Sequence, residues 1–252
     1  HERGKKIYVT VNTLVKQCEI DDLCDVLELL CCCRADAAIV QDMGVIRIAQ
    51  ERYPDLTLHA STQMTVNNYR SAKWLKEQGI CRIVPSRELS LSELQEIKEK
   101  AHIEVEAFIH GAMCYGYSGQ CLFSSFLGGR SGNRGRCAQP CRLPYAVNCD
   151  NHTSKKNKDI FPLSLKDLCS LPYLYDLLDT GIDSFKIEGR MKSPEYVAGV
   201  TSVYRKYMDM YYEGKRPEFA KEDLNKLSNL YIRSEMKDGY LRKHNGKDMV
   251  SV

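Results

Sequence analysis

The chain has 252 residues, of which 43% are hydrophobic and 27% are charged. A chain of this size and composition can bury a sizeable core, which excludes disordered and collagen-like proteins. The 36 Lys and Arg residues against 33 Asp and Glu residues give a net charge of +3, which by itself favours no class of partner. No window approaches the roughly 18 apolar residues of a membrane span, and the polar N-terminus shows no signal peptide.

The unusual feature of the composition is its twelve cysteines. A chain of this length does not need disulfides to be stable, and no secretory signal is visible. We therefore expect a reducing compartment, the cytoplasm, in which some thiols bind a metal or act in catalysis.

Six segments have the continuous apolar character of strands covered on both faces, as in a parallel sheet. They are residues 6–12, 37–42, 56–62, 81–86, 103–110 and 184–188. Amphipathic stretches at helical spacing lie between these segments, at residues 20–30, 66–78, 90–100 and 165–180. A strand-to-strand period of about 20–30 residues is typical of a barrel or an open α/β sheet.

Local signals mark the ends of several predicted helices. Ser90 and Glu93 have the spacing of a capping box, in which each residue satisfies an amide of the first helical turn. Gly79 and Gly181 follow their helices directly and are expected to end them.

Polar side chains follow the predicted strands at their carboxyl ends. These residues are Asn12, Gln41, Asp42, His59, Ser61, Gln63, Arg87, Glu88, His110, Glu188 and Arg190. In a (β/α)8 barrel this end of the strands carries the functional groups. Any one polar residue after a strand is ordinary, but the whole set favours a functional rim.

A connection of about fifty residues follows His110, which is uncommon in a compact domain unless the segment is functional. It contains Cys114, Cys121, Cys137 and Cys141 among glycines. Four thiolates on flexible spacers can surround one soft metal centre. The wide spacing suits an iron–sulfur cluster, although zinc, and thiols that are unligated or paired in disulfides, remain alternatives. Residues 148–159 of this connection are polar and are expected to be a solvated excursion.

The same connection is locally basic. It carries Arg130, Arg134, Arg136 and Arg142, and residues 119–147 include no Asp or Glu. Guanidinium groups match phosphates and carboxylates, so a polyanion or a dicarboxylate is an expected ligand. The alternative is a solvated loop whose charge is balanced elsewhere.

The other cysteines are expected to be structural. Cys18, Cys24 and residues 31–33 lie in or beside a predicted helix, where a free thiol is usually a small buried hydrophobe. Cys81 begins a strand and is expected in the core, and Cys149 is an incidental exposed thiol. Cys169 lies where a helix is predicted to begin, and it could replace one of the four metal ligands.

Four blocks of the sequence resemble a known family. Residues 106–125, with Cys114 and Cys121, are similar to the signature of the collagenase-like peptidase family of unknown catalytic type. Residues 59–63, 128–142 and 185–194 are similar to further blocks of that family. The resemblance extends from Lys6 to about Gly214. Residues 128–142 and the tail at 238–249 look most like its long, rRNA-cytidine-hydroxylase-like branch.

The resemblance implies a function other than proteolysis. Better-understood relatives hydroxylate a tRNA wobble uridine or a large-subunit rRNA cytidine, and others hydroxylate a quinone precursor. These relatives hold a [4Fe–4S] cluster on four cysteines, and the RNA-directed members depend on prephenate. The matching positions here are Cys114, Cys121, Cys137 and Cys141, with Cys169 as a possible substitute.

Relatives of this family begin with a further stretch that contains two βα units. We therefore expect an N-terminally truncated TIM-like barrel with six of its eight strands. Residues 1–213 would form this partial barrel, with the cluster-binding loop at 111–160. Residues 214–252 would form an extension that leads into a further domain.

The leading hypothesis is an iron–sulfur protein that hydroxylates a pyrimidine in RNA. His110, Glu188 and Arg190 are its candidates for proton transfer or substrate orientation. The residues expected to bind RNA or a dicarboxylate co-substrate such as prephenate are His59, Gln63, Arg87, Glu88, Arg130, Arg134, Arg136 and Lys186.

Two other functions remain open, and the sequence does not indicate an oligomeric state. A collagenase-like peptidase is disfavoured because no H-E-x-x-H motif occurs and Ser124 and Ser125 have no base nearby in the sequence. A zinc-stabilised, non-catalytic RNA-binding module would use the same four cysteines.

Overall fold

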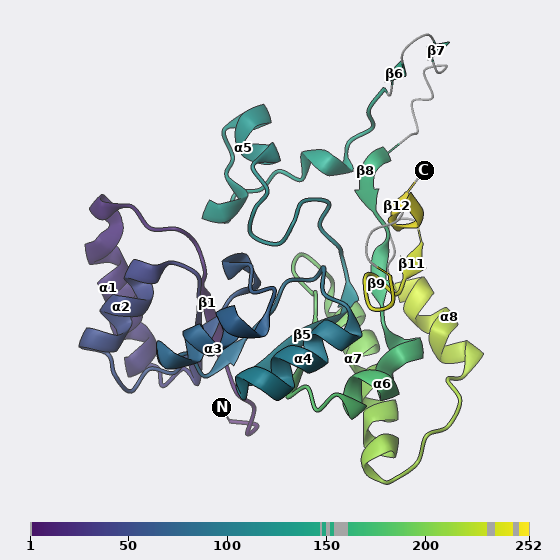
Figure 1. Ribbon diagram of the computed structural model, residues 1–252, viewed down its shortest axis with the longest axis horizontal. Coiled ribbons are helices and arrows are strands. Elements are labelled where there is room, and N and C mark those ends of the chain that lie inside the picture. Colours follow the sequence, from purple (N-terminus) through teal and green to yellow (C-terminus); the bar gives the residue numbers. More distant parts are fainter. Residues whose placement is uncertain are drawn as a thin grey trace. The chain divides into compact units, whose positions relative to one another are not determined.

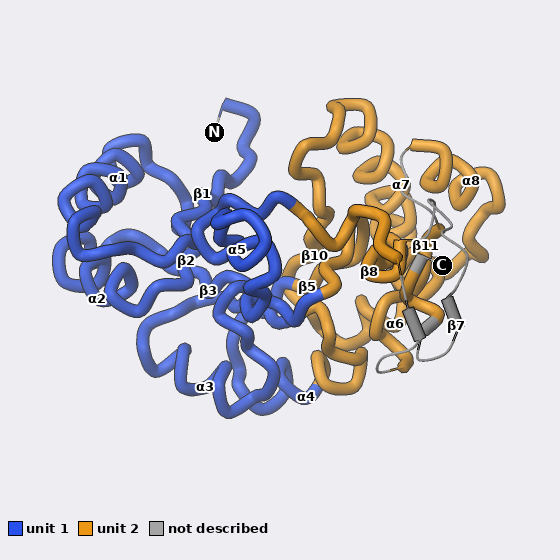
Figure 2. The backbone as a smooth tube through the Cα atoms, turned by 90° about the horizontal axis from the view of Figure 1, so that it is seen from above, with its two compact units in different colours: residues 1–86, 96–106, 116–138 blue, residues 87–95, 107–115, 139–252 orange. Residues whose placement is uncertain are grey.

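The computed structural model describes residues 2–146, 148–149, 152–153, 161–230, 235–243 and 247–251, and Figure 1 labels its helices and strands. The chain divides into two compact units, which Figure 2 colours blue and orange. Unit 1 comprises residues 1–86, 96–106 and 116–138. Unit 2 comprises residues 87–95, 107–115 and 139–252.

Unit 1 is built on a parallel sheet whose strands follow the order of the chain. Its strands are β1 (Tyr8–Val11), β2 (Ala37–Val40), β3 (Leu58–Ala60), β4 (Arg82–Ile83) and the first residues of β5 (Glu104–Gly111). Ile39 pairs with Thr10 on one side and with His59 on the other. All four residues of β2 are buried, as a strand covered on both faces requires.

Helices and short 3-10 turns connect the strands of unit 1. The helices are α1 (Ile20–Cys32), α2 (Met43–Arg52), α3 (Tyr69–Glu77), the last residues of α4 (Leu91–Ala101), and α5 (Phe123–Gly128). The 3-10 turns are Gln17–Glu19, Thr62–Met64 and Gly132–Arg134. Asp42 begins α2 by accepting the amides of Gly44 and Val45, which are orphan donors of the first turn.

Unit 2 has a different strand arrangement. Its strands are the end of β5, β8 (Phe161–Leu165), β9 (Asp167–Cys169), β10 (Ser184–Ile187), β11 (Met236–Lys237) and β12 (Val250–Ser251). β9 lies between β5, to which it is antiparallel, and β11, to which it is parallel. β10 pairs with β5, and β8 pairs with β12. The strands β6 (Asn148–Cys149) and β7 (His152–Thr153) form an antiparallel pair.

The helices of unit 2 are α6 (Leu174–Asp179), α7 (Pro194–Tyr212), α8 (Lys221–Leu230) and the beginning of α4. Its 3-10 turns are Pro140–Arg142, Leu171–Tyr173 and Lys247–Met249. Ser193 caps α7 by accepting the amide of Tyr196. Among the described residues, no helix is both long enough and apolar enough to cross a membrane.

The predicted α/β organisation with mainly parallel strands is confirmed, because a strand forms within each of the six predicted segments. The capping box is also confirmed: the Ser90 amide donates to Glu93 at 2.8 Å, and the Glu93 amide donates to Ser90 Oγ at 3.4 Å. Gly79 and Gly181 end their helices with positive φ angles of 78° and 72°.

The helix predicted over residues 165–180 is wrong in its first part. Residues 167–169 form β9, and the helix α6 begins only at Leu174. The Asp167 amide donates to the Glu235 carbonyl at 2.9 Å, and the Ser170 amide donates to the Ile109 carbonyl at 3.0 Å. Partners distant in the sequence therefore override the local helical pattern.

The expected burial of the structural cysteines is wrong at several positions. Cys18, Cys81 and residues 31–33 are exposed, and Cys24 is half-buried. On α1 the core face is formed by Leu23, Leu27 and Leu30, so Cys31 and Cys32 fall outside it. The expected exposure of Cys149, like most of the excursion at 148–159, lies outside the described side chains.

Candidate functional site

In unit 1, residues 116–138 of the cysteine-rich connection reach the carboxyl ends of neighbouring parallel strands. The carbonyl of Asn133 accepts the Leu14 amide at 3.1 Å, just beyond β1. The same carbonyl accepts Gln41 Nε2 at 3.0 Å, at the end of β2. Asn12 Nδ2 donates to Ser61 Oγ at 3.0 Å, which links the ends of β1 and β3. The loop and the strand ends therefore form one hydrogen-bonded rim within this unit.

A glycine brings the loop against the segment after β3. Gly119 has a φ of +76°, and a Cβ placed there would lie 2.2 Å from the Gln63 carbonyl oxygen. Thr65 Oγ1 also donates to the Ser118 carbonyl at 2.8 Å. Gln63 thus contacts the loop through its main chain. His59 is buried and packs edge-on against Tyr8, with ring centroids 4.9 Å apart.

The loop arginines of unit 1 differ in their surroundings. Arg134 forms a two-pronged ion pair with Glu19, at 2.5 and 2.8 Å, and donates to the Leu14 carbonyl at 2.6 Å. The hydrogen bond from Arg134 lowers the pKa of Glu19 to about 2. Arg130 Nε donates to the carbonyl of Arg136 at 3.1 Å, and both side chains are exposed. Arg134 therefore anchors the loop, whereas Arg130 and Arg136 present their charge to solvent.

Two of the candidate ligand thiols, Cys121 and Cys137, belong to unit 1. A Cβ placed on Gly116 would lie 2.6 Å from the Cβ and 2.9 Å from the Sγ of Cys121, so glycine forms a close cradle there. A Cβ placed on Gly132 would lie 3.6 Å from the Cβ of Cys137 and 4.0 Å from the Cys121 carbonyl oxygen. The two cysteines therefore flank the same glycine.

The other two candidate thiols, Cys114 and Cys141, belong to unit 2. Arg142, next to Cys141, donates to the carbonyl of Met113, next to Cys114. The same guanidinium donates to Ser164 Oγ at 2.7 Å and to the Leu165 carbonyl at 2.6 Å. One planar cation thus holds both cysteine-bearing segments against β8.

Charged residues also gather at the strand ends of unit 2. Arg87 lies 3.2 Å from Glu188, and its guanidinium carbon is 4.1 Å from the ring centroid of Phe108. Lys186 Nζ lies 5.5 Å from the same centroid. Glu188 also accepts the Arg190 amide at 3.2 Å. Two cations therefore lie over one aromatic ring, and one of them pairs with the Glu188 carboxylate. Guanidinium and ammonium groups of this kind can bind an anionic ligand.

Two further residues that the sequence predicts for the site, Glu88 and Arg190, differ in the exposure of their side chains. Glu88 is buried, at 6% exposed, and Arg190 is exposed. The main chain of Glu188 is also held in place, because its amide donates to the His110 carbonyl at 2.8 Å.

His110 lies inside unit 2, at 1% exposure. Its Nδ1 is 3.3 Å from the hydroxyl of Tyr204, which donates to the Ile109 carbonyl at 3.0 Å. Burial, with a smaller contribution from Lys192, lowers the pKa of His110 to about 4. The ring is therefore neutral at pH 7.

Cys169 shares this buried network. Its Sγ lies 3.9 Å from the Tyr204 hydroxyl, and burial raises the pKa of the thiol. Tyr204 is missing from the residues that the sequence predicts for the site. Its signal was the periodic buried face of α7, which includes Tyr196, Val200 and Tyr207.

The structure thus brings together Cys121 with Cys137, the segments of Cys114 and Cys141, and the Arg87–Lys186–Glu188 set. Across the described part of the chain, no three His, Cys, Asp or Glu side chains gather as a metal-ion site. The cysteines described there form no disulfide. Sequence reasoning also missed Glu19 and Phe108, which have no motif of their own.

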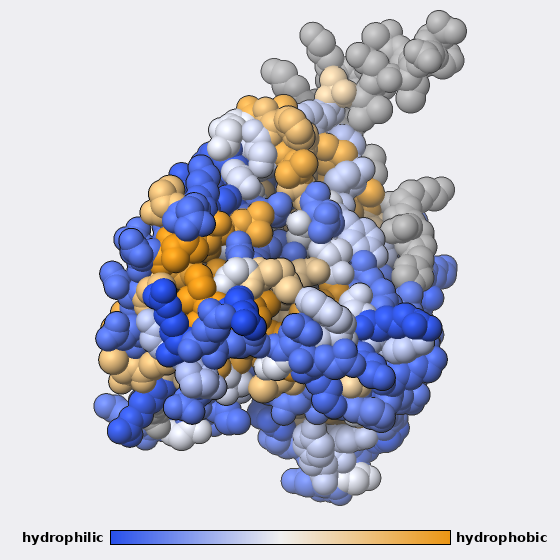
Figure 3. Space-filling model, turned by 60° about the vertical axis from the view of Figure 1, so that its left-hand side comes forward, coloured by the Kyte–Doolittle hydropathy of each residue, from blue (hydrophilic) through white to orange (hydrophobic). Residues whose placement is uncertain are grey.

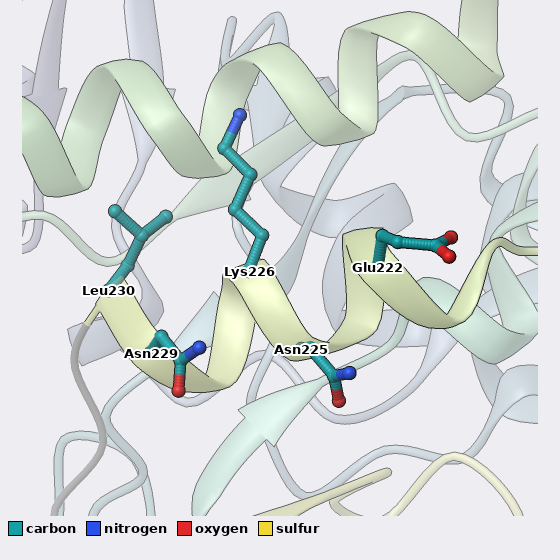
Figure 4. A pocket seen from close by; sticks show the side chains of 5 residues that line it. All are labelled: Glu222, Asn225, Lys226, Asn229 and Leu230. Atoms are coloured by element: carbon teal, nitrogen blue, oxygen red, sulfur yellow. The ribbon is translucent and has the colours of Figure 1, made fainter.

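A hollow on the surface of unit 2 is separate from all of these residues. It is lined by one side of α8, at Glu222, Asn225, Lys226, Asn229 and Leu230 (Figure 4). Lys226 Nζ donates to Ser202 Oγ on α7 at 3.3 Å. The hollow contains no residue that the sequence predicts for the site.

Comparison with known proteins identifies the family. The model of peptidase family U32 matches residues 1–251. tRNA hydroxylation protein P1 of Bacillus subtilis is 41% identical over 213 residues, which are 82% of this chain and 50% of that protein. The 23S rRNA 5-hydroxycytidine C2501 synthase of Escherichia coli is 38% identical over 94% of this chain and 36% of that protein.

An uncharacterized protease of Methanocaldococcus jannaschii is 36% identical over 91% of this chain and 58% of that protein. The chain therefore spans about a third to three-fifths of the length of these relatives. A solved U32 peptidase structure matches 43% of this chain and 47% of its own, with a TM-score of 0.39 and 20% identity.

Proposed function

The chain belongs to peptidase family U32, as its sequence blocks predict, and we propose that it acts in the hydroxylation of a pyrimidine base in RNA. Two relatives bear the names of a tRNA hydroxylation protein and an rRNA 5-hydroxycytidine synthase. The observation that carries the proposal is the basic, cysteine-bearing loop bonded across the strand ends of unit 1 through Asn133. This end of a parallel sheet is where ligands bind in α/β proteins.

Cys114, Cys121, Cys137 and Cys141 would hold a [4Fe–4S] cluster. Their fit is supported by the close approach of Gly116 to Cys121 and by the Arg142 bonds that join the other two segments. Such a cluster supplies electron transfer or a Lewis-acid site when bound. Cys169 is a less favourable ligand because it is buried beside Tyr204.

Arg130 and Arg136 would contact RNA phosphates, and Arg134 would hold their loop in place. Arg87 and Lys186 would bind the carboxylates of a small co-substrate such as prephenate, since guanidinium and ammonium groups pair with carboxylates. His59 and Gln63 in unit 1 and Glu88 in unit 2 would each support the binding groups of their own unit, because His59 and Glu88 are buried and Gln63 contacts the loop through its carbonyl.

Glu188 is the best placed of the three candidates for proton transfer, because its carboxylate is partly exposed beside Arg87. His110 is buried, and its pKa of about 4 is too low for a base or acid at neutral pH. We therefore propose that His110 positions the Glu188 main chain through its carbonyl, and that the exposed Arg190 orients the substrate.

The test of the function is a comparison of nucleosides, by mass spectrometry, in tRNA and rRNA from wild-type and deletion cells. We expect one hydroxylated pyrimidine to disappear and to return when the full-length gene is restored. Identical nucleoside profiles in both strains would contradict the proposal.

The cluster has a separate test, which is the iron and sulfide content of anaerobically reconstituted protein. We expect Cys121→Ser and Cys137→Ser to lower both, and the exposed Cys81→Ser to leave them unchanged. One zinc with no labile sulfide would instead support the zinc-stabilised RNA-binding module.

The peptidase alternative has less support. Ser124, one of its candidate nucleophiles, is buried, and its Oγ accepts the Ala138 amide at 2.9 Å. Cleavage of gelatin by the purified protein, lost on a single substitution, would revive this alternative.

Two further expectations belong to this proposal. We propose that the parallel strands are part of an eight-stranded barrel in the whole protein, because βα units recur at the barrel period. We also propose a cytoplasmic location, because the described cysteines form no disulfide.

A further inference from the structure

The short helix α5 of unit 1 presents apolar side chains to solvent. Phe126 is 83% exposed, Leu127 is 62% exposed, and Leu122, just before the helix, is 50% exposed. A single exposed apolar residue is ordinary, but adjoining ones mark a contact surface. Apolar residues form orange patches on the surface that Figure 3 displays.

The exposure of Phe126 is a consequence of how α5 is held. Ser124 is buried, and its Oγ accepts the amide of Ala138 at 2.9 Å. Its carbonyl accepts the Arg130 amide at 3.2 Å, and the Ser125 carbonyl accepts the Gly129 amide at 2.9 Å. Two helical positions span about 200°, so a helix bonded at Ser124 turns Phe126 to the opposite side.

The chain that follows α5 is positively charged. Arg130 and Arg136 are exposed, and the bond from Arg130 to the Arg136 carbonyl leaves both charges uncompensated by that contact. Arg134, by contrast, is paired with Glu19. Residues 116–138 contain no Asp or Glu, so the sequence around α5 supplies only cations.

An exposed aromatic side chain that is followed closely in the chain by exposed arginines matches the chemistry of unpaired nucleic acid. Unstacked bases stack on aromatic rings, and arginines neutralise the phosphates between them. An apolar helix from a protein partner would use the apolar side chains but would leave the arginine charges without a match. A paired RNA stem would offer the phosphates but no open base face.

We propose that Leu122, Phe126, Leu127, Arg130 and Arg136 form a binding surface for unpaired RNA nucleotides that flank the modified base. Phe126 stacks on one base, the leucines cover its edges, and the two arginines contact phosphates. This surface rests on the proposed function and assigns its RNA contacts to α5.

The test is fluorescence anisotropy with a labelled, unstructured pyrimidine-rich RNA of about 12 nucleotides and with the same sequence as a duplex. We expect the full-length protein to prefer the single strand. Phe126→Ala should weaken that binding by about 5- to 150-fold, which corresponds to the ~1–3 kcal/mol of one base–aromatic stack. Phe126→Tyr, which keeps an aromatic ring, should keep the wild-type affinity, and Phe126→Leu should not.

Leu29→Ala is the matched control, because Leu29 is 59% exposed on α1 of the same unit. It should change the affinity by less than twofold. Arg130→Gln and Arg136→Gln should each reduce the slope of log affinity against log salt by about 0.7. Circular dichroism of each variant would verify that the fold is intact.

Three results would overturn the surface. They are undetectable single-strand binding by wild type, unchanged binding by Phe126→Ala, and a Phe126→Ala variant that changes the oligomeric mass instead of the affinity. The last would indicate that α5 joins copies of the chain. Because binding is measured without turnover, a Phe126-dependent complex alongside unchanged nucleosides in deletion cells would refute the proposed function and leave the surface intact.

Discussion

The guanidinium of Arg142 donates a hydrogen bond to the carbonyl of Met113. The two residues are 29 positions apart, and each is the immediate neighbour of a candidate ligand cysteine. Further bonds to Ser164 Oγ and the Leu165 carbonyl attach the same side chain to β8. The geometry of Cys114 and Cys141 in unit 2 therefore depends on a residue that would not itself bind a metal.

Replacing Arg142 should loosen both cysteine-bearing segments. Arg142→Gln cannot satisfy three acceptors at once, so we expect the free energy of unfolding to fall by about 2 kcal/mol and iron loading to fall with it. Urea unfolding and iron analysis measure the two effects. Arg205→Gln, which breaks an exposed i,i+4 pair with Asp209, should cost less than about 0.5 kcal/mol. Equal effects of the two substitutions would contradict the assigned role.

The ion pair between Arg134 and Glu19 should make the loop of unit 1 sensitive to acid. The pKa of Glu19 is about 2 in the folded chain, below its ordinary value of 4.5. The pair therefore stabilises the loop fully above about pH 4.5 and progressively less as the pH falls toward 2.

NMR titration of the Glu19 carboxyl carbon measures this shift directly. We expect a midpoint near 2 in wild type and a return toward the ordinary value in Arg134→Gln. A midpoint that does not respond to this substitution would assign the shift to another group.

His110 should also lower the stability in acid, but its cause is the burial of an uncharged ring and not an ion pair. Its pKa is about 4 in the folded chain against 6.5 ordinarily, so the unfolded chain binds the proton more readily. The stability that this group contributes is therefore complete above pH 6.5 and decreases as the pH falls toward 4, by roughly 3 kcal/mol at most.

Urea unfolding at pH 7 and pH 4.5 checks this expectation. The loss between the two pH values should be smaller in His110→Gln than in wild type. A wild-type stability that is flat between them would contradict the burial of an uncharged ring.

Gly111 should not tolerate a side chain. Its φ is +109°, and a Cβ would lie 2.8 Å from both the Cβ and the carbonyl oxygen of Glu188. Gly111→Ala should lower the free energy of unfolding by roughly 2–4 kcal/mol and displace Glu188 from Arg87. Gly181 has a φ of +72° but open space around it, so Gly181→Ala should cost only about 1 kcal/mol. Urea unfolding of both variants separates the cost of the positive φ, which both share, from the cost of the collision with Glu188, which only Gly111→Ala has.

Several features of the fold could be predicted because their causes are local. The apolar run at 37–42 requires a strand covered on both faces, and β2 is buried throughout. Ser90 and Glu93 are close enough in the chain to find each other in any helix that begins there. Cys121 and Cys137 could likewise be singled out from composition and spacing.

Other features could not be predicted, because their partners are distant in the chain. Arg134 has the same local setting as Arg130, yet only Arg134 meets Glu19, which lies 115 positions earlier. The residues around Cys169 have the local pattern of a helix start, but they form β9, which lies between β5 and β11.

The sequence by itself determined which chemical groups this protein has, namely the thiols, the basic loop and the polar rim, because composition and periodicity are properties of neighbouring residues. The tertiary structure alone decided which of these groups are accessible. It buried His110 and Cys169 around Tyr204, exposed Cys81, and turned Phe126 outward. Burial depends on long-range packing, and packing also sets the pKa and the partners of each group.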